Sequence, residues 1–292
     1  MIKFLKHNEI DKAAWDDCLM QSAHGRINAL SWYLDVVSPG WNALVMDDYE
    51  AIMPLPMRKK WMLDYLFIPL FTQQLGVFSI YNNENKLLGK FLRALPVSII
   101  YIDQFLNASH INASGTKEIR TTQVLQLSQS YEAIYSGYTE NLKRNLKKSA
   151  GLYIIHDVTP GLVVKMFSEE KNETVETLEA GALDTLEKII EAIIEHKAGY
   201  CIGIADSNGE IISSACIAKM GKRIYYFKGS STAKGKDRGA MHKLLDHVIQ
   251  TNAGQPLEFD FQGSVQPGLM RFYKSFGATD EYYRHVNKFR FI

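Results

Sequence analysis

The sequence has little cysteine, no long apolar run and almost no net charge, and each absence excludes a class of protein. Three cysteines occur among 292 residues, none in a Cys-x-x-Cys pair, which argues against a disulfide framework or a zinc site. No stretch approaches the roughly 20 apolar residues that span a bilayer. The segment MIKFLKHNEIDKAAW soon becomes charged, so we expect no signal peptide. A reduced, cytoplasmic protein is therefore expected.

Lys and Arg total 33 against 32 for Asp and Glu, which leaves a formal charge of +1. Nucleic-acid binding cannot be inferred from this balance, and any basic patch must be local. The eight histidines include no His-x-x-x-His pair, so we expect no metal site, and no Ser-His or Cys-His nucleophile signature is present. With 46% hydrophobic and 22% charged residues, the chain is typical of a soluble globular protein with room for two domains.

Residues 200–291 predict a compact α/β unit. The predicted order is three strands, a helix, a strand at 257–261, a helix that begins at Pro267, and a final strand at 283–291. The turns at 207–209 and 220–222 are typical of hairpins. The first part of the chain shows a looser alternation of the same kind. We predict an α/β (α+β) protein of two domains, residues 1–130 and 131–292.

Four segments, which together touch both halves of the chain and keep the order that they have in the family, resemble one known family. The segment YKSFGA (273–278) resembles the end of the last helix in GNAT-type N-acyltransferases, with Tyr273 four residues before Gly277. Three further segments resemble FemAB-type proteins, the branch with two tandem GNAT-like domains: PLFTQQLGVFS (69–79), the basic segment YTENLKRNLKKSAGLYI (138–154) and the strand-to-loop segment LEFDFQGS (257–264).

The resemblance implies a fold, an activity and partners. Each domain would be a mixed, mostly antiparallel sheet flanked by helices. The protein would be a transferase that moves an acyl or aminoacyl group from acyl-CoA or aminoacyl-tRNA to an amine. The donor would bind the second domain, and a small-molecule or peptide acceptor would lie on the first-domain side, between the domains. Acyl-CoA is the candidate cofactor and tRNA a candidate partner, with no metal and no membrane span.

A second group of residues predicts an anion site at a strand-to-helix junction. Glycines let backbone amides approach a phosphate, and cations neutralise it. The segment YYFKGSSTAKGKDRG (225–239) supplies both, through Lys228, Gly229, Lys236, Arg238 and Gly239. Met241 stands where the acyl-CoA loop of the resembled family has glycine or alanine. The alternative interpretation is a solvated linker.

The predicted helix at 138–150 carries clustered cations. At about 100° per residue, Lys143, Arg144 and Lys147, with Lys148, share one face, opposite Leu142 and Leu146. This face could hold the phosphates of a tRNA, a nucleotide-linked substrate or CoA. A solvated helix face, which is what most charge runs form, is the alternative.

Two residues are candidates for catalysis. Tyr273 could protonate a leaving thiolate or alkoxide, because a phenol of pKa near 10 is a suitable donor. Asp260, at the end of a strand, could deprotonate the acceptor amine. The alternatives are a core tyrosine packed among phenylalanines and a carboxylate that caps or bonds a loop.

The sequence leaves a second function open. Because the anion loop is incomplete at Met241, the chain could be a catalytically silent protein that binds a nucleotide-linked or peptide ligand. In the first half, four residues could line an acceptor pocket: Trp32, Tyr33, Gln73 and Gln74.

Overall fold

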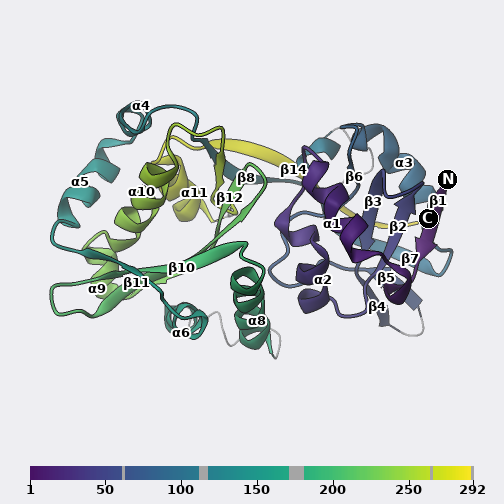
Figure 1. Ribbon diagram of the computed structural model, residues 1–292, viewed down its shortest axis with the longest axis horizontal. Helices are drawn as coiled ribbons and strands as arrows, with labels where there is room; N and C mark the ends of the chain where they lie inside the picture. Colours follow the sequence, from purple (N-terminus) through teal and green to yellow (C-terminus); the bar gives the residue numbers. More distant parts are fainter. Residues whose placement is uncertain (61–62, 112–117, 171–180, 264–265, 291–292) are drawn as a thin grey trace. The chain divides into compact units, whose positions relative to one another are not determined.

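The computed structural model describes residues 1–60, 63–111, 118–170, 181–263 and 266–290. The chain forms two compact units: unit 1 comprises Met1–Thr121 and Glu281–Ile292, and unit 2 comprises Thr122–Asp280. In each unit helices pack on mostly antiparallel strands, and this confirms the predicted fold class (Figure 1). No described helix is long and apolar enough to cross a membrane.

Unit 1 has two sets of hydrogen-bonded strands. The first set is antiparallel throughout, in the order β1 (Ile2–Leu5), β2 (Asn42–Met46), β3 (Ala51–Leu55), β6 (Phe78–Ser79). In the second set only the β5–β7 pair is parallel, and the order is β4 (Met57–Lys60), β5 (Leu63–Leu66), β7 (Ile99–Leu106), β14 (Thr279–Phe289). The helices are α1 (Lys12–Gln21), α2 (Ser31–Val37) and α3 (Glu84–Ala94), with short 3-10 turns η1 (His7–Glu9), η2 (Ile27–Ala29) and η3 (Ala108–His110).

Unit 2 has one row of strands in which only the β13–β12 pair is parallel. The order is β8 (Glu118–Gln126), β13 (Glu258–Asp260), β12 (Arg223–Ser231), β11 (Ile211–Met220), β10 (Gly199–Ala205), β9 (Tyr153–His156). The helices are α4 (Tyr131–Ser136), α5 (Glu140–Lys148), α6 (Pro160–Glu170), α8 (Ala182–Glu195), α9 (Ala233–Asp237), α10 (Ala240–Asn252), α11 (Pro267–Lys274).

Helices cover both faces of the unit 2 strands. Successive side chains of a strand point to opposite faces, so neighbouring residues of one strand contact different helices. In β11, Ala215 packs in the core cluster that holds Leu244 and Val248 of α10. The neighbouring Ser214 contacts Met166 of α6 on the other face, with 3.2 Å between Oγ and Sδ. Figure 1 shows α10 on one side of β10 and β11, with α6 and α8 on the other.

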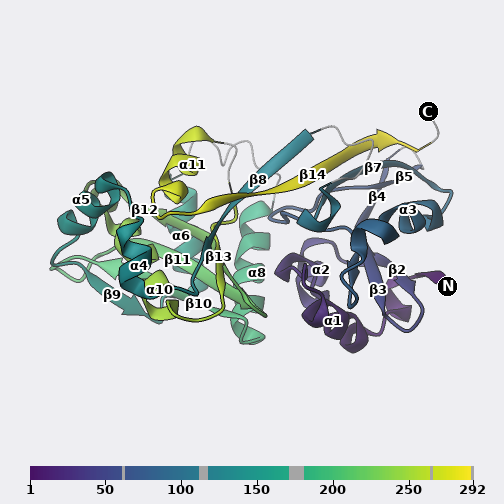
Figure 2. The same cartoon turned by 90° about the horizontal axis from the view of Figure 1, so that it is seen from above.

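The units do not divide the chain where the sequence prediction does. The predicted domains meet between residues 130 and 131 and place the C-terminal segment in the second domain. In the structure, Glu281–Ile292 belongs to unit 1. Residues Arg284–Phe289 of β14 pair with β7 (Figure 2). The Arg290 guanidinium donates to the two carbonyls that follow α3, at Leu95 (3.2 Å) and Pro96 (2.6 Å). These bonds form only after folding, so local sequence patterns do not reveal them.

A buried histidine makes unit 1 sensitive to acid. His110 is fully buried, and its Nε2 accepts the Val77 N–H at 3.2 Å. Burial, with a smaller effect of His24, lowers the pKa of His110 from 6.5 to about 4. The unfolded chain therefore binds this proton at a higher pH than the folded chain does.

We predict that the free energy of unfolding falls as the pH falls from about 6.5 towards 4. The full effect of the His110 shift is roughly 3 kcal/mol. Urea unfolding at about pH 7 and about pH 4.5 tests this in the wild type and in His110→Gln. The variant should lose less stability between the two conditions, and equal losses would contradict the assignment.

Candidate functional site

The site forms where two parallel strands separate. Strand β13 pairs with β12 only from Arg223 to Tyr225, whereas β12 continues to Ser231. Just beyond that point the β11–β12 register shifts, since Cys216 faces Lys228 and Ile217 faces Tyr226. Phe227 is thus an extra residue, and such a bulge bends its strand. The later part of β12 has no neighbour in β13, and the two strand ends leave an opening.

A cavity of about 490 Å³ occupies this opening, wholly within unit 2. It is lined by the end of β12 and by residues of four neighbouring segments. These are Tyr226, Phe227, Lys228, Gly229, Ser230 and Ser231 of β12; Phe167 and Glu170 of α6; Gly235, Lys236, Met241 and His242 of α9 and α10; Phe261, Gln262 and Gly263 after β13; and Leu269, Phe272 and Tyr273 of α11.

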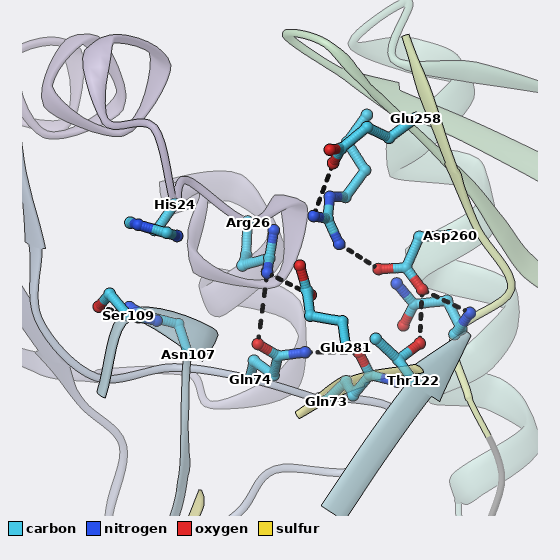
Figure 3. A network of polar contacts seen from close by, with 12 residues as sticks. His24, Arg26, Gln73, Gln74, Asn107, Ser109, Thr122, Glu258, Asp260 and Glu281 are labelled. Atoms are coloured by element: carbon cyan, nitrogen blue, oxygen red, sulfur yellow. Dashed lines mark hydrogen bonds and ion pairs between the residues drawn. The ribbon is translucent and has the colours of Figure 1, made fainter. Parts of the chain in front are cut away.

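Asp260 holds the strands at the point where they separate. Its side chain is fully buried and accepts from Thr122 Oγ1 of β8 (2.6 Å) and from Arg223 Nη1 of β12 (2.9 Å) (Figure 3). It also accepts the Gln262 N–H at 2.8 Å. Gln262 and Gly263 both have positive φ, so this bond fixes the sharp turn at the cavity edge. Asp260, predicted as a general base, is not among the described cavity residues.

Tyr273, the predicted general acid, lies in the aromatic wall of the cavity. Its ring stacks on Phe261 with centroids 5.0 Å apart, and the Tyr226 ring lies 6.2 Å away. Burial, together with the Glu170 carboxylate, raises the pKa of Tyr273 to about 12. The hydroxyl therefore keeps its proton at neutral pH and can donate it. Tyr273 is only 6% exposed, so it is a core tyrosine, and it also forms part of the cavity wall. Both interpretations of the sequence therefore describe it.

One carboxylate and two cations line the cavity among the described residues. Glu170 Oε1 lies 2.8 Å from Lys236 Nζ, and Glu170 Oε2 accepts the Ser231 N–H at 3.3 Å. The Lys228 ammonium lies 5.0 Å from the centre of the Phe167 ring. Burial and the Lys148 charge lower the pKa of His242 to about 4, so this cavity histidine is neutral at pH 7.

The two glycines predicted for cofactor binding are required by packing. A Cβ on Gly229 would lie 2.7 Å from the Tyr226 hydroxyl. Gly239 has φ +67° at the start of α10, and a Cβ there would lie 2.6 Å from the Asn145 carbonyl of α5. Gly229 lines the cavity, whereas Gly239 joins α9 and α10 beside α5.

The other predicted cations lie outside the cavity lining. Arg238 donates to the Ala150 carbonyl at 3.2 Å. On α5, Lys143 pairs with Glu140 at 3.1 Å, Arg144 contacts Asn141 at 3.4 Å, and Lys147 is exposed. Lys228, Gly229, Lys236 and Tyr273 thus line one cavity. Asp260, Arg238, Gly239 and the α5 cations are not among its described lining residues.

The glutamines considered for an acceptor pocket belong to a polar network inside unit 1. Gln74 is fully buried, donates to Gln73 Oε1 (3.1 Å) and accepts from Arg26 Nη2 (3.5 Å) (Figure 3). Arg26 also pairs with Glu281 at 2.8 Å. Tyr33 is a core residue whose hydroxyl donates to the Phe71 carbonyl at 2.6 Å.

Sequence reasoning missed the α6 side of the cavity. Phe167 and Glu170 are three residues apart, hence on one helix face, and both line the cavity. From its sequence pattern we predict this helix over 160–169, one residue short of Glu170, whereas α6 runs from Pro160 to Glu170. The sequence feature that could have indicated Glu170 is its position in the last turn of a predicted helix. A carboxylate there interacts unfavourably with the helix dipole, which suggests that it has a role other than stabilising the helix.

The fold resembles that of known proteins along nearly its whole length. FemX superposes with a TM-score of 0.70 at 12% identity, covering 98% of this chain and 97% of that chain. A conserved protein of unknown function from Bacteroides thetaiotaomicron has a TM-score of 0.57 at 12% identity, with 99% and 100% covered. L-PGS from Bacillus licheniformis has a TM-score of 0.52 at 12% identity, with 94% and 91% covered.

By sequence, no family model and no curated protein matches the chain. The structural matches, at these identities, establish the fold alone. They confirm the predicted resemblance to FemAB-type proteins in the fold.

We predict that Asp260→Asn lowers the free energy of unfolding by roughly 3–5 kcal/mol, because it leaves the Arg223 charge without its buried partner. Glu258→Gln is the matched control: it contacts the same guanidinium at 2.7 Å but is 34% exposed, so its loss should stay below about 1 kcal/mol. Urea unfolding measures both. Equal, small losses would show that Asp260 does not hold the strands together.

Proposed function

We propose that the protein is an N-acyltransferase that moves an acyl or aminoacyl group from an activated donor to an amine. The observation that supports this most is the cavity where β12 and β13 separate, with the protonated hydroxyl of Tyr273 in its wall. The fold that the chain shares with FemX along nearly its whole length, together with the sequence resemblance to FemAB-type proteins, supports the same class.

The cavity residues suit direct transfer without a covalent intermediate. An amine attacks the donor carbonyl, and a new C–N bond replaces the C–S or C–O bond to the leaving group. Tyr273 donates its proton to the departing thiolate or alkoxide. Glu170, the carboxylate among the described cavity residues, would accept the proton that the amine releases. Such a reaction depends on positioning and proton transfer, which the rigid aromatic wall favours.

The donor's phosphates have two places to bind in unit 2. The first is the cavity, at Lys228 and at Lys236, whose ammonium is paired with Glu170; the second is the basic face of α5, with Lys143, Arg144 and Lys147. A tRNA would contact many phosphates, and its binding would weaken steeply with salt, whereas CoA contacts few. We propose the second domain as the donor side, with a small-molecule or peptide amine as acceptor.

We predict that Tyr273→Phe lowers the transfer rate by roughly 100-fold, since it removes the proton donor and keeps the aromatic packing. Purified protein is assayed with acetyl-CoA, a longer acyl-CoA and aminoacyl-tRNA against a panel of amines. Because the pKa of Tyr273 is raised to about 12, its ionisation should not reduce the wild-type rate below about pH 10.

Tyr131→Phe is the matched control. Its hydroxyl donates to Asp246 at 2.9 Å, away from the cavity, so this variant should keep its transfer rate. Equal rates in Tyr273→Phe and the wild type would remove Tyr273 from the mechanism. Binding of a donor without turnover of any would instead favour the ligand-binding alternative.

A further inference from the structure

We infer that Cys201 and Cys216 form a redox-active dithiol beside the unit 2 cavity: a peroxide oxidises them to a disulfide, and a dithiol reductant restores them. The inference goes beyond the proposed transfer reaction, which uses neither residue. The two cysteines lie on the neighbouring strands β10 and β11, and both are free thiols in the structure. Their spacing in the sequence does not indicate a pair, because only the strand register brings them together.

The first observation is that register. Cys201 lies directly opposite Cys216 in the antiparallel ladder, so both side chains point to the same face of the strands. The Lys219 N–H donates to the Ala198 carbonyl at 2.6 Å, which makes Ala198 and Lys219 a hydrogen-bonded pair. Hydrogen-bonded and non-hydrogen-bonded pairs alternate along the ladder. The cysteines lie an odd number of positions further along and therefore form a non-hydrogen-bonded pair, the kind with the closer side chains.

A disulfide can bridge a pair of this kind. Its Cα atoms lie about 4.5 Å apart, within the range of roughly 4.4–6.8 Å found in disulfides. The adjoining ladder of β11 and β12 shows how close such side chains come, since the hydroxyl oxygens of the opposed Ser213 and Ser231 are 2.9 Å apart. The Cβ atoms must still approach by roughly 1 Å. The strain makes the bond easy to reduce again.

The second observation is that the two thiols interact with each other. Hydrogen bonding by Cys216 lowers the pKa of Cys201, against the effect of burial. The same contact, together with burial, raises the pKa of Cys216. Cys201 is therefore the thiol that ionises first and attacks an oxidant. Cys18 is equally buried but has no thiol beside it, and burial with the Glu84 charge raises its pKa to about 12.

The oxidation has two steps. The Cys201 thiolate attacks one oxygen of hydrogen peroxide, the O–O bond breaks, and the departing hydroxide takes up the proton that Cys201 released, which leaves a sulfenic acid and water. The Cys216 sulfur then attacks the Cys201 sulfur. An S–S bond forms, the S–O bond breaks, and a second water leaves with the Cys216 proton. Because Cys201 is 4% exposed and Cys216 is fully buried, we expect a slow reaction that needs an oxidant as small as peroxide.

The pair adjoins the unit 2 cavity. On the other side of β11, Cys216 lies opposite Lys228 of β12, a cavity residue, and the register shift follows at Ile217. Movement of Cys216 towards β10 therefore pulls on the β11–β12 ladder at its irregular point. We expect the amide hydrogens of residues 226–231 to exchange faster in the oxidised than in the reduced protein.

Peptide mass spectrometry tests the inference, because both cysteines lie in one tryptic peptide, residues 198–219. The folded protein is treated with hydrogen peroxide, then unfolded, alkylated with iodoacetamide and digested. We expect this peptide to carry no alkyl group and to weigh two hydrogen atoms less than the unalkylated reduced peptide. Dithiothreitol should restore both alkylation sites. The peptide that contains Cys18 should be alkylated throughout.

Two variants assign the roles of the thiols. Cys216→Ser keeps a hydrogen-bond donor beside Cys201 but cannot form a disulfide, so Cys201 should stop at the sulfenic acid, which dimedone labels. In Cys201→Ser, Cys216 should stay a thiol. Peroxide should leave the exchange of residues 226–231 unchanged in Cys216→Ser. Circular dichroism confirms that each variant is folded.

Full alkylation of Cys201 and Cys216 after peroxide treatment of the folded wild type would overturn the inference. A disulfide that forms only when peroxide is added in urea, or oxidation of Cys18 to the same extent, would do so too. A disulfide that leaves the exchange of residues 226–231 unchanged would contradict the effect on the cavity.

Discussion

The buried contacts of Asp260 are the constraint on which the unit 2 site depends. One carboxylate joins three neighbouring strands, through Thr122 of β8, Arg223 of β12 and its own place at the end of β13. It also fixes the turn at Gln262. Because the pairing of β12 with β13 stops at this residue, the rest of β12 has no partner in β13, and the cavity lies there.

The chemistry of the cavity follows from what covers the separated strand ends. From one face of the sheet, α10 and α11 supply His242 and Tyr273, a neutral and mostly aromatic wall in which a phenol keeps its proton. From the other face, α6 supplies Glu170, which neutralises Lys236. The proposed proton donor, Tyr273, and the Glu170–Lys236 pair thus come from helices on opposite faces of the sheet.

Much of the fold could be predicted from local patterns, and the site only in part. Pro267 marked the start of α11, and the predicted strand at 257–261 contains β13, since turn residues and apolar runs act locally. The motif around Tyr273 led to a cavity residue. Asp260 has its partners in β8 and β12, Arg290 bonds the Leu95 carbonyl just after α3, and Glu170 of α6 pairs with Lys236 of α9. Such pairings arise only from tertiary contacts.

The central claim is that a donor binds along the part of β12 that extends beyond Tyr225. Hydrogen–deuterium exchange with mass spectrometry tests this directly, with and without 3′-deoxy-3′-(glycylamino)adenosine. We predict slower exchange in peptides that cover residues 226–231 and 261–263, with the peptides of unit 1 unchanged. Protection confined to unit 1, with the end of β12 unaffected, would contradict the claim.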